Sequence, residues 1–235
     1  MKYKVGIICA SDDEFTPFIE HMENVVITEK AMLSIYEGEI CGIRTVALFS
    51  GVCKVNAAIA TEILIDIFHA DIIINCGVAG GMNDDLEIFD TVVSERVCYH
   101  DVADDILTEF HPWMKSVWFL SDEKLLQLSH KAVQKKDYRV YFGSTVTGEE
   151  FISDEGRYEI NEKYSPLSTD METAAIAHVC YVNKIPFIAI RTITDTQKKS
   201  GLENFELNCK KASVIAKDLT LALICEIKES DIDFG

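Results

Sequence analysis

The chain has 235 residues, of which 48% are hydrophobic, and a formal net charge of −17 that comes from 22 basic and 39 acidic side chains. This size and composition suit one α/β domain over residues 1–235 and argue against disorder. The acidic balance argues against nucleic acid or an anionic membrane surface as a partner, and no apolar run reaches the roughly 18 residues of a membrane span.

The first expected strand is Tyr3–Ala10, a short run of apolar and β-branched residues. It ends in the acidic turn 11–14, and a helical pattern follows as far as Met22. Ligands of open α/β sheets bind at the carboxyl ends of strands, so the acids of this turn are candidates for a site. Helix capping explains part of the same pattern, because Ser11 or Asp12 suits the N-cap and the other acids suit the first turn.

The middle of the chain alternates strands and helices, which favours a mostly parallel or mixed sheet flanked by helices. A glycine cluster, Gly77–Gly81, either brings backbone close to a ligand or makes a tight turn, and it matches neither a dinucleotide fingerprint nor a P-loop. The expected elements are a hairpin of Met32–Glu39 and Ile43–Phe49 turning at Cys41-Gly42, a helix over Val55–His69, a strand over Asp71–Cys76 that breaks at the glycine cluster, a strand over Asp90–Tyr99, an irregular segment 102–118, a helix over Ser121–Lys135, a strand over Tyr138–Val146 and a helix over Asp154–Tyr164.

Glu172 opens a helical run over residues 174–179, after Thr169 and Asp170, either of which can cap the helix. A carboxylate at a helix N-terminus faces free N–H groups and the positive end of the helix dipole, so we expect Glu172 to be ionised. An ordinary first-turn acid is the alternative interpretation, because helix starts are rich in Asp and Glu for local reasons.

Asp195 follows an apolar run, Pro186–Ile190, of the kind expected for a strand covered on both faces. It therefore stands where a catalytic acid would be placed, although a plain turn residue or N-cap fits the same position. Arg191 lies between the two, and an Arg in such a strand is costly to bury unless it meets an anion. A long last helix is expected over Glu203–Glu229.

The chain carries no CxxC pair and no paired Cys/His zinc spacing, so we expect neither a metal nor an organic cofactor. The apolar stretch near the N-terminus is too short for a signal peptide. Most cysteines lie in apolar, strand-like or helix-like contexts, which predicts reduced, buried thiols in a cytoplasmic protein. The eight are Cys9, Cys41, Cys53, Cys76, Cys98, Cys180, Cys209 and Cys225.

Four segments in order carry a resemblance to a known family: GIICASDDEF, SGVCKVNAA, INCGVAGG, and TDMETAAIAHVC followed by IPFIAIRTITD. With YHD, GEEFI and the late Phe205 they resemble the 5′-methylthioadenosine/S-adenosylhomocysteine nucleosidases, within the purine nucleoside phosphorylase/uridine phosphorylase superfamily. The resemblance implies a three-layer α/β/α sandwich with a mixed, barrel-like twisted sheet. It also implies a homodimer, for which Phe110 and Trp113 of segment 102–118 are the candidate contact.

The resemblance assigns each candidate residue a role in cleaving an adenine nucleoside. Asp195 matches the general acid that protonates adenine at N7, and Glu14 matches the acid that activates the attacking water. Glu172 matches the ligand of the ribose hydroxyls. The remaining matches are Met171 beside Glu172, Arg191 supporting the sugar and water region, Phe151 stacking on adenine, the Ile152 backbone reading the base edge, and Val52 and Phe205 near the 5′-alkylthio group.

The chemistry of N-glycosidic cleavage agrees with these roles, because it builds an oxocarbenium-like sugar and negative charge on the departing base. Asp195 must be protonated when it acts, so we expect burial or neighbouring carboxylates to raise its pKa. The acidic first turn would repel a phosphate dianion, which favours water over phosphate as the nucleophile. A phosphate site needs Arg or Lys, so Arg191 complicates this argument. Lys54 is a second cation, and the sequence does not fix its position relative to the site.

Two residues depart from the family pattern and bear on the substrate. Val78 stands where a Ser is common in the glycine loop, and Ser11 stands where Met is usual. The alternatives to 5′-thioadenosine hydrolysis are therefore a nucleosidase for another adenine nucleoside, a phosphate-dependent nucleoside phosphorylase and a nucleoside-binding protein without turnover.

Overall fold

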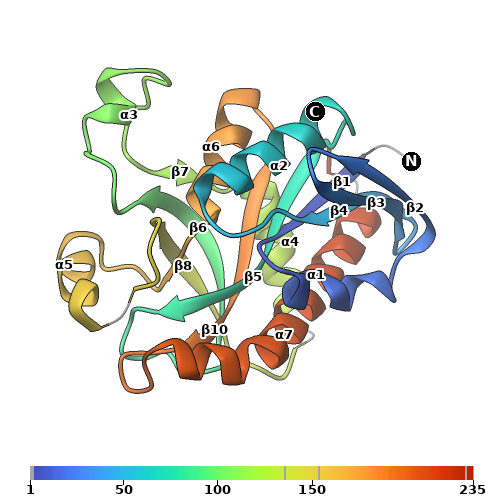
Figure 1. Cartoon of the computed structure of the whole chain (residues 1–235). Coiled ribbons are helices and arrows are strands. Elements are labelled where there is room, and N and C mark those ends of the chain that lie inside the picture. The colour runs from blue at the N-terminus through green and yellow to red at the C-terminus, as the bar shows by residue number, and fades with distance from the viewer. Residues whose placement is uncertain (1–2, 135, 153, 231, 235) are drawn as a thin grey trace.

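The computed structural model describes residues 3–134, 136–152, 154–230 and 232–234, and its centre is a twisted sheet with helices on both faces (Figure 1). In the described part of the chain this sheet has ten strands. They are β1 Lys4–Cys9, β2 Glu23–Lys30, β3 Leu33–Ile40, β4 Ile43–Phe49, β5 Ile72–Gly81, β6 Thr91–Tyr99, β7 Phe119–Leu120, β8 Val140–Thr147, β9 Ser168–Asp170 and β10 Phe187–Asp195.

The strand order explains how the sheet is both mixed and barrel-like. The path runs β10-β6-β8-β9-β5-β1-β4-β3-β2, and β10 also pairs with β5, so β5, β10, β6, β8 and β9 close into a ring. β1 is parallel to β4 and β5, whereas β3 is antiparallel to β4 and β6 is antiparallel to β10. The expected mixed, twisted sheet is confirmed.

Helices cover the two faces of this sheet and give the expected three layers. One apolar cluster joins β1 to α1, α4 and α7, and a second joins the opposite face to α2 and α6. Val5 and Ile7 belong to the first cluster and Ile8 to the second, as the alternation of side chains along a strand requires. The helices are α1 Asp12–Ile19, α2 Lys54–Asp66, α3 Ile106–Glu109, α4 Glu123–Val133, α5 Asp154–Tyr164, α6 Thr173–Asn183 and α7 Leu202–Glu229.

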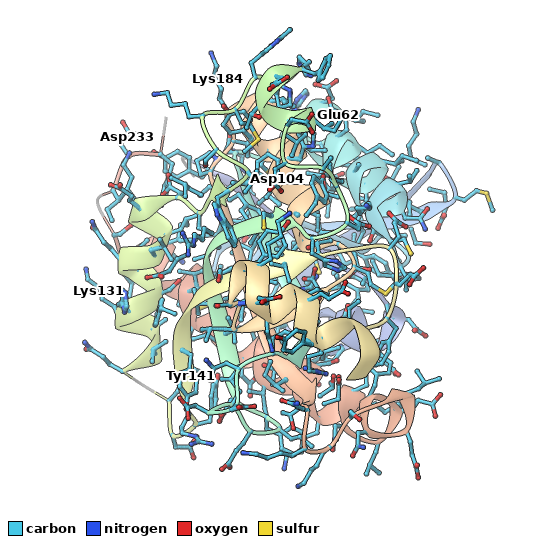
Figure 2. The ribbon with its side chains drawn as sticks, turned by 90° about the vertical axis from the view of Figure 1, so that its left-hand side faces the viewer. Glu62, Asp104, Lys131, Tyr141, Lys184 and Asp233 are labelled. Atoms are coloured by element: carbon cyan, nitrogen blue, oxygen red, sulfur yellow. A yellow bond between two sulfur atoms is a disulfide. The ribbon has the colours of Figure 1, made fainter. Side chains whose placement is uncertain are left out.

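Some charged side chains lie on the outside of these layers, and others are buried between them. Figure 2 looks onto the side of the molecule that carries α5, with Lys131 and Lys184 toward its outline, and these two residues and Asp104 are exposed. No helix among the described residues has the length and apolar character needed to cross a membrane.

Most elements match the sequence-based expectations, and the differences have local causes. β2 was not predicted, because all its residues are exposed and it lacks an alternating pattern. β9 has three residues, too few for a periodic signal. α1 ends at Ile19 and α2 at Asp66, before the predicted limits, and α4 ends at Val133, while Lys135 lies outside the described residues.

The glycine cluster does not break β5, so that prediction is wrong. β5 continues to Gly81, because β10 pairs with it up to Gly80 and β9 pairs with Gly80 and Gly81. β10 likewise runs through Arg191 to Asp195 instead of ending before them. The pairing between β5 and β10, which continues to Gly80 and Asp195, holds these residues extended, whatever their own preferences.

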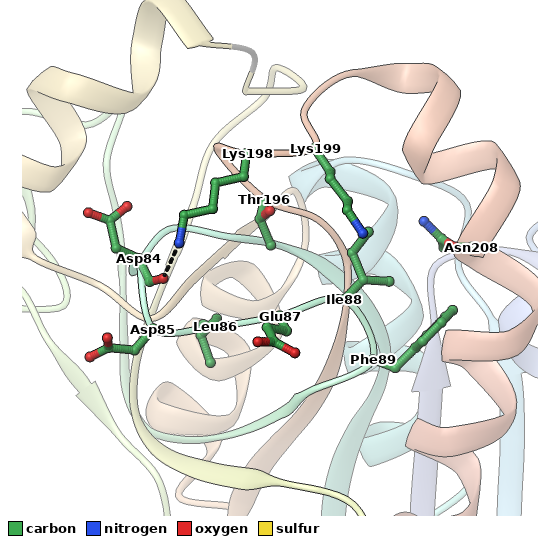
Figure 3. A pocket seen from close by; sticks show the side chains of 10 residues that line it. All are labelled: Asp84, Asp85, Leu86, Glu87, Ile88, Phe89, Thr196, Lys198, Lys199 and Asn208. Atoms are coloured by element: carbon green, nitrogen blue, oxygen red, sulfur yellow. Dashed lines mark hydrogen bonds between the residues drawn. The ribbon is translucent and has the colours of Figure 1, made fainter.

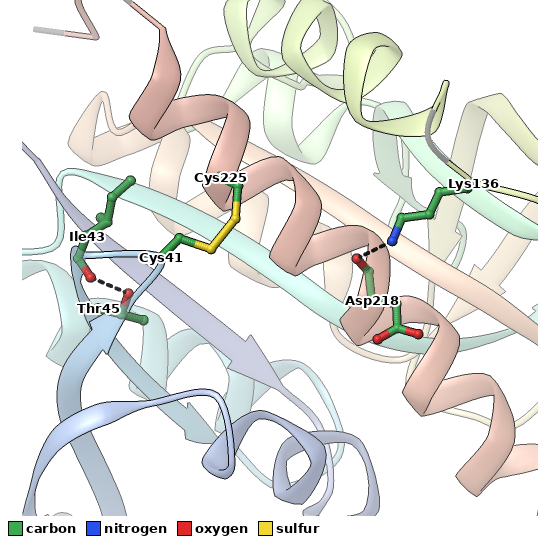
Figure 4. The surroundings of a disulfide bond; sticks show 6 residues. All are labelled: Cys41, Ile43, Thr45, Lys136, Asp218 and Cys225. Carbon is green, nitrogen blue, oxygen red and sulfur yellow. Dashed lines mark hydrogen bonds between the residues drawn. A yellow bond between two sulfur atoms is a disulfide. The ribbon is translucent and has the colours of Figure 1, made fainter.

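The expectation of eight reduced thiols is wrong for one pair, because Cys41 and Cys225 form a disulfide (Figure 4). Cys41 lies in the turn between β3 and β4, and α7 passes beside that turn with Cys225 facing it, at a Cα–Cα distance of 5.7 Å. The two are 184 residues apart in sequence, so no local pattern links them. Of the six free cysteines Cys53 is half-buried, and the others are buried.

Candidate active site

A cavity of about 120 Å³ lies at the carboxyl ends of β1, β5 and β10, where strand ends and helix starts converge. A hollow of about 30 Å³ adjoins it and is lined by Ile152 together with Phe151 and Asp195. The cavity brings together eight predicted site residues, namely Glu14, Val52, Val78, Phe151, Met171, Glu172, Asp195 and Phe205. Arg191 does not line it and lies behind the wall, completely buried.

Glu14 is held by the first turn of α1. Ser11 caps this helix, as expected, and forms a capping box with Glu14. The Glu14 carboxylate accepts N–H donors from Ala10 at 2.6 Å, Ser11 at 3.1 Å and Val78 at 2.8 Å. Burial raises its pKa, while Arg191 and these N–H groups act in the opposite direction.

Arg191 forms ion pairs with three acidic side chains of the site and lies outside the cavity lining. Its guanidinium lies 2.8 Å from Asp170 Oδ2, 3.4 Å from Glu172 Oε2 and 3.7 Å from Glu14 Oε1. The anion that a buried Arg requires is therefore supplied by the protein itself. Gly77 permits this arrangement, since a Cβ there would lie under 3.0 Å from Glu14 Oε1 and Arg191 Nη1.

Glu172 is the N-cap residue of α6, yet its side chain does not cap the helix. Asp170 Oδ1 accepts the N–H groups of Glu172 and Thr173 instead, which confirms Asp170 rather than Thr169 as the capping side chain. Glu172 Oε1 accepts the Cys53 N–H at 2.9 Å. Burial raises the pKa of Glu172 to about 7, so the expectation of a fully ionised carboxylate is wrong.

Asp195 ends β10 and is buried. Its Oδ1 accepts the Thr194 hydroxyl at 3.0 Å, and its Oδ2 lies 3.6 Å from Nη2 of Arg157, a residue of α5. Burial raises the pKa of Asp195, in the direction expected, while Thr194 and Arg157 lower it. Burial is the cause, rather than a neighbouring carboxylate.

Aromatic and apolar side chains form the rest of the wall. Phe151 and Phe205 meet edge to face across the cavity, with ring centroids 5.9 Å apart. Val52 lies at the rim with 48% of its surface exposed, whereas Val78 is buried. Such a wall accepts flat and apolar ligand groups, while the carboxyls supply the polar contacts.

Three residues of this region were not among the predicted site residues: Asp170 and Thr169, which were predicted only as helix caps, and Arg157. Asp170 pairs with Arg191, and its place in the TDME segment could have marked it. Thr169 lines the cavity and its Oγ1 has no hydrogen-bond partner among the described residues. Arg157 had no signal, because a single Arg in a short polar helix reads as a surface residue.

A larger hollow of about 710 Å³ lies between segment 84–89 and the loop that carries Lys198 and Lys199 (Figure 3). The acids and lysines along its sides are exposed, and Lys198 Nζ donates to the carbonyl of Asp84 at 3.2 Å. Its one buried amide, Asn208, already donates to Thr194 and Asn204. The smaller cavity, where buried carboxyls with raised pKa values meet, is therefore the candidate active site.

Comparison with known proteins shows the family of the chain. The sequence profile described as "Phosphorylase superfamily" matches residues 4–224. The chain belongs to the phosphorylase superfamily. Within this superfamily it is 34% identical to the 5′-methylthioadenosine/S-adenosylhomocysteine nucleosidase of Bacillus subtilis (strain 168), over 95% of this chain and 99% of the relative. The enzyme of the same name from Shewanella piezotolerans is also 34% identical, over 95% and 100%.

Solved structures of nucleosidases have a similar fold. The nucleosidase of this name from Neisseria meningitidis, in complex with methylthio-immucillin-A, has a TM-score of 0.88 at 33% identity and covers 96% of this chain and 99% of its own. The one from Colwellia psychrerythraea 34H, in complex with adenine, has a TM-score of 0.88 at 30% identity and covers 96% of each chain. The resemblance drawn from the sequence motifs, and the fold that it implied, are confirmed.

Proposed function

We propose that this protein hydrolyses the N-glycosidic bond of 5′-thioadenosines, releasing adenine and the thioribose. The observation that carries the proposal is the convergence of three buried carboxyls, Glu14, Glu172 and Asp195, on one cavity with an aromatic wall. Relatives named for this activity align over nearly the whole chain and support it. The proposal treats residues 1–235 as one domain that needs no cofactor or metal for the reaction.

Asp195 is the general acid in this proposal. It gives its proton to N7 of adenine as the bond to the sugar breaks, which removes the charge that develops on the base. A buried carboxyl with a raised pKa keeps the proton that this step requires. Phe151 stacks on the base, and the Ile152 backbone reads its edge.

Glu14 orients and activates the attacking water. Three backbone N–H donors fix its carboxylate, so it needs no reorganisation as the proton is taken. Glu172 binds the ribose hydroxyls beside Met171, and Arg191 supports these carboxylates from behind. Val52 and Phe205 receive the 5′-alkylthio group, and Val78 lies near the sugar.

Water suits this site better than phosphate as the nucleophile. Glu14 and Glu172 would repel a dianion in a desolvated cavity. Arg191, which complicated the sequence argument, is already surrounded by carboxylates, and Lys54 lies 2.8 Å from Asp101 Oδ2 and does not line the cavity. Neither cation is therefore available to a phosphate.

The product assay tests the function directly. Incubation with 5′-methylthioadenosine in phosphate-free buffer should release adenine and methylthioribose in equal amounts. Strict dependence on phosphate, with formation of a ribose 1-phosphate, would identify a phosphorylase instead. Tight binding without product over hours would identify a nucleoside-binding protein. Parallel reactions with adenosine and 5′-deoxyadenosine measure the preference for the 5′-group, which Val78 and Ser11 bear on.

We further propose that the protein is a homodimer whose interface uses the outer face of α2 and α6 and segment 102–118. The two helices pack side by side, and they expose apolar residues such as Val55, 68% exposed, while Trp113 on the segment is 66% exposed. Ile59→Glu on α2 should give a monomer in light scattering at micromolar concentration. Leu207→Glu, on exposed α7 surface, should remain dimeric. A monomeric parent protein contradicts the proposal.

A cytoplasmic location and a role in methionine salvage complete the proposal. Methylthioribose retains the methylthio group, so the reaction would return it to salvage. The free thiols favour a reducing compartment, whereas the Cys41–Cys225 disulfide weighs against one. Fractionation of the source cells, followed by the product assay on each fraction, tests the location.

A further inference from the structure

Arg157 has an environment that a structural anchor does not need. It lies on α5, its side chain is 2% exposed, and Nη1 donates to the Gly81 carbonyl and lies 3.3 Å from the Met82 sulfur. Among the described residues, its Nε and Nη2 have no hydrogen-bond partner. Nη2 lies 3.6 Å from Asp195 Oδ2, an oxygen that also has no hydrogen-bond partner there.

A buried guanidinium with unmatched N–H groups is costly, so its retention requires a reason. An anchor that ties α5 to β5 would need only the contact with Gly81. The additional feature is a full positive charge facing the free oxygen of Asp195 in a buried site, where electrostatic interactions are strong. The position of Arg157 therefore affects the free-energy difference between protonated and ionised Asp195, and not only the stability of α5.

We propose that Arg157 is a positioning residue that sets the acid strength of Asp195 by stabilising the carboxylate left after proton transfer. This inference rests on the proposed function. In the step concerned, the bond between the sugar C1′ and the base breaks with its electron pair going to the base. The proton of Asp195 moves to base N7, and water adds to C1′ while its proton passes to Glu14. Asp195 thus becomes an anion within the buried site, where Arg157 faces it.

The other groups around Asp195 do not supply this charge. Thr194 of β10 donates a neutral hydroxyl, Gly80 of β5 has no side chain, and Thr169 of β9 is neutral. The same cavity is lined by the acidic residues Glu14, Asp170 and Glu172, whose negative charge would destabilise ionised Asp195. Phe205, the residue that α7 contributes to the cavity wall, is neutral. Within the described ranges, Arg157 is the one cation within ion-pair distance of Asp195.

The test is the pH profile of kcat/KM for adenine release by the full chain. Removal of the charge in Arg157→Gln should make Asp195 a weaker acid. The basic limb should then move up by about one pH unit, and the plateau should fall about tenfold. Arg157→Lys should retain most of the parent profile. If the residual activity of Asp195→Asn lacks the basic limb, the limb reports the titration of Asp195. Glu159→Gln, an exposed change on α5, is the matched control and should leave the profile unchanged.

The outcomes separate the two claims. If the parent protein releases no adenine, the proposed function fails. If it releases adenine, while Arg157→Gln lowers the plateau without moving the basic limb, Arg157 is a structural residue and the inference is overturned. Arg157→Gln in the Asp195→Asn background gives a further measurement, because it should cause no additional loss, and an additional tenfold loss contradicts the inference.

Discussion

At the scale of single residues, burial decides the state of the acids in the site. Glu14, Glu172 and Asp195 are each almost fully buried, and burial is the largest cause of the raised pKa of all three. Backbone N–H groups and Arg191 offset part of this effect at Glu14. The raised pKa of Asp195 favours the protonated form that a general acid needs, whereas Arg191 and the N–H groups favour the ionised form of Glu14 that accepts a proton from water.

The first residue-scale prediction concerns Asp195→Asn, which keeps the shape of the side chain and removes the proton donor. Substrate binding should remain, and turnover should fall on the order of 10²-fold or more, the usual size of a general-acid contribution. Steady-state adenine release and calorimetric binding measure the two effects. Near-full turnover by the variant would remove Asp195 from the mechanism.

The second residue-scale prediction concerns how Glu172 makes the free energy of unfolding depend on pH. Its folded-state pKa of about 7 exceeds the ordinary value of 4.5, so the stability that its protonated form contributes is present below about pH 4.5 and is lost as the pH rises through about 7. Glu172→Gln cannot ionise, so its free energy of unfolding should improve relative to the parent between about pH 5 and about pH 8. Urea unfolding measures this. A difference that does not depend on pH would contradict it, and Glu159→Gln should show none.

At the scale of elements, β5 and β10 shape the site because they stay extended where sequence suggested a break. Gly77 pairs with Arg191 in register, and the two strands therefore carry a small residue and a buried cation side by side. The missing side chain at Gly77 leaves the space in which Glu14 of α1 approaches Arg191. The pairing of β5 with β10 thus allows Glu14 of α1 to lie close to Arg191 of β10, although the two residues are far apart in sequence.

We predict that Gly77→Ala separates Glu14 from Arg191, because the added methyl group would lie too close to both. Activity should fall at least tenfold, and the free energy of unfolding should drop by about 1–3 kcal/mol. Adenine release and urea unfolding measure these effects. Gly156→Ala on α5 is the control, since its Cβ meets its nearest neighbour at an ordinary 3.6 Å. Equal behaviour of the two variants would contradict the packing argument.

At the scale of the whole molecule, the disulfide and α7 connect distant parts of the fold. Cys41 in the β3–β4 turn is joined to Cys225 on α7, whose opposite end brings Phe205 to the cavity. Lys136 donates to the Asp218 carbonyl of the same helix at 2.9 Å (Figure 4). α7 is thus joined to the β3–β4 turn through Cys225 and to Lys136 through Asp218.

Cys41→Ser should lower the free energy of unfolding by about 2–4 kcal/mol under non-reducing conditions, because the bond closes a loop of 184 residues in the unfolded chain. In excess reductant the parent and the variant should unfold alike. Thiol titration of the unfolded, non-reduced parent should count six free thiols. A count of eight would show that the bond does not form in solution.

The sequence by itself determined what depends on neighbours along the chain. The residue pattern predicted α5 with its observed bounds, the acidic turn limited the cap of α1 to Ser11 or Asp12, and the ordered motifs identified the superfamily and the site residues that now share a cavity. These signals are local, because capping and periodicity act over a few residues.

Only the tertiary structure decided what depends on residues brought together from afar. It surrounded Arg191 with three acidic partners, raised the pKa of Glu172 against the helix dipole, joined Cys41 to Cys225 and set Arg157 against Asp195. The physical reason is that burial and ion pairing depend on which elements pack against a side chain, and no local pattern in the chain encodes that packing.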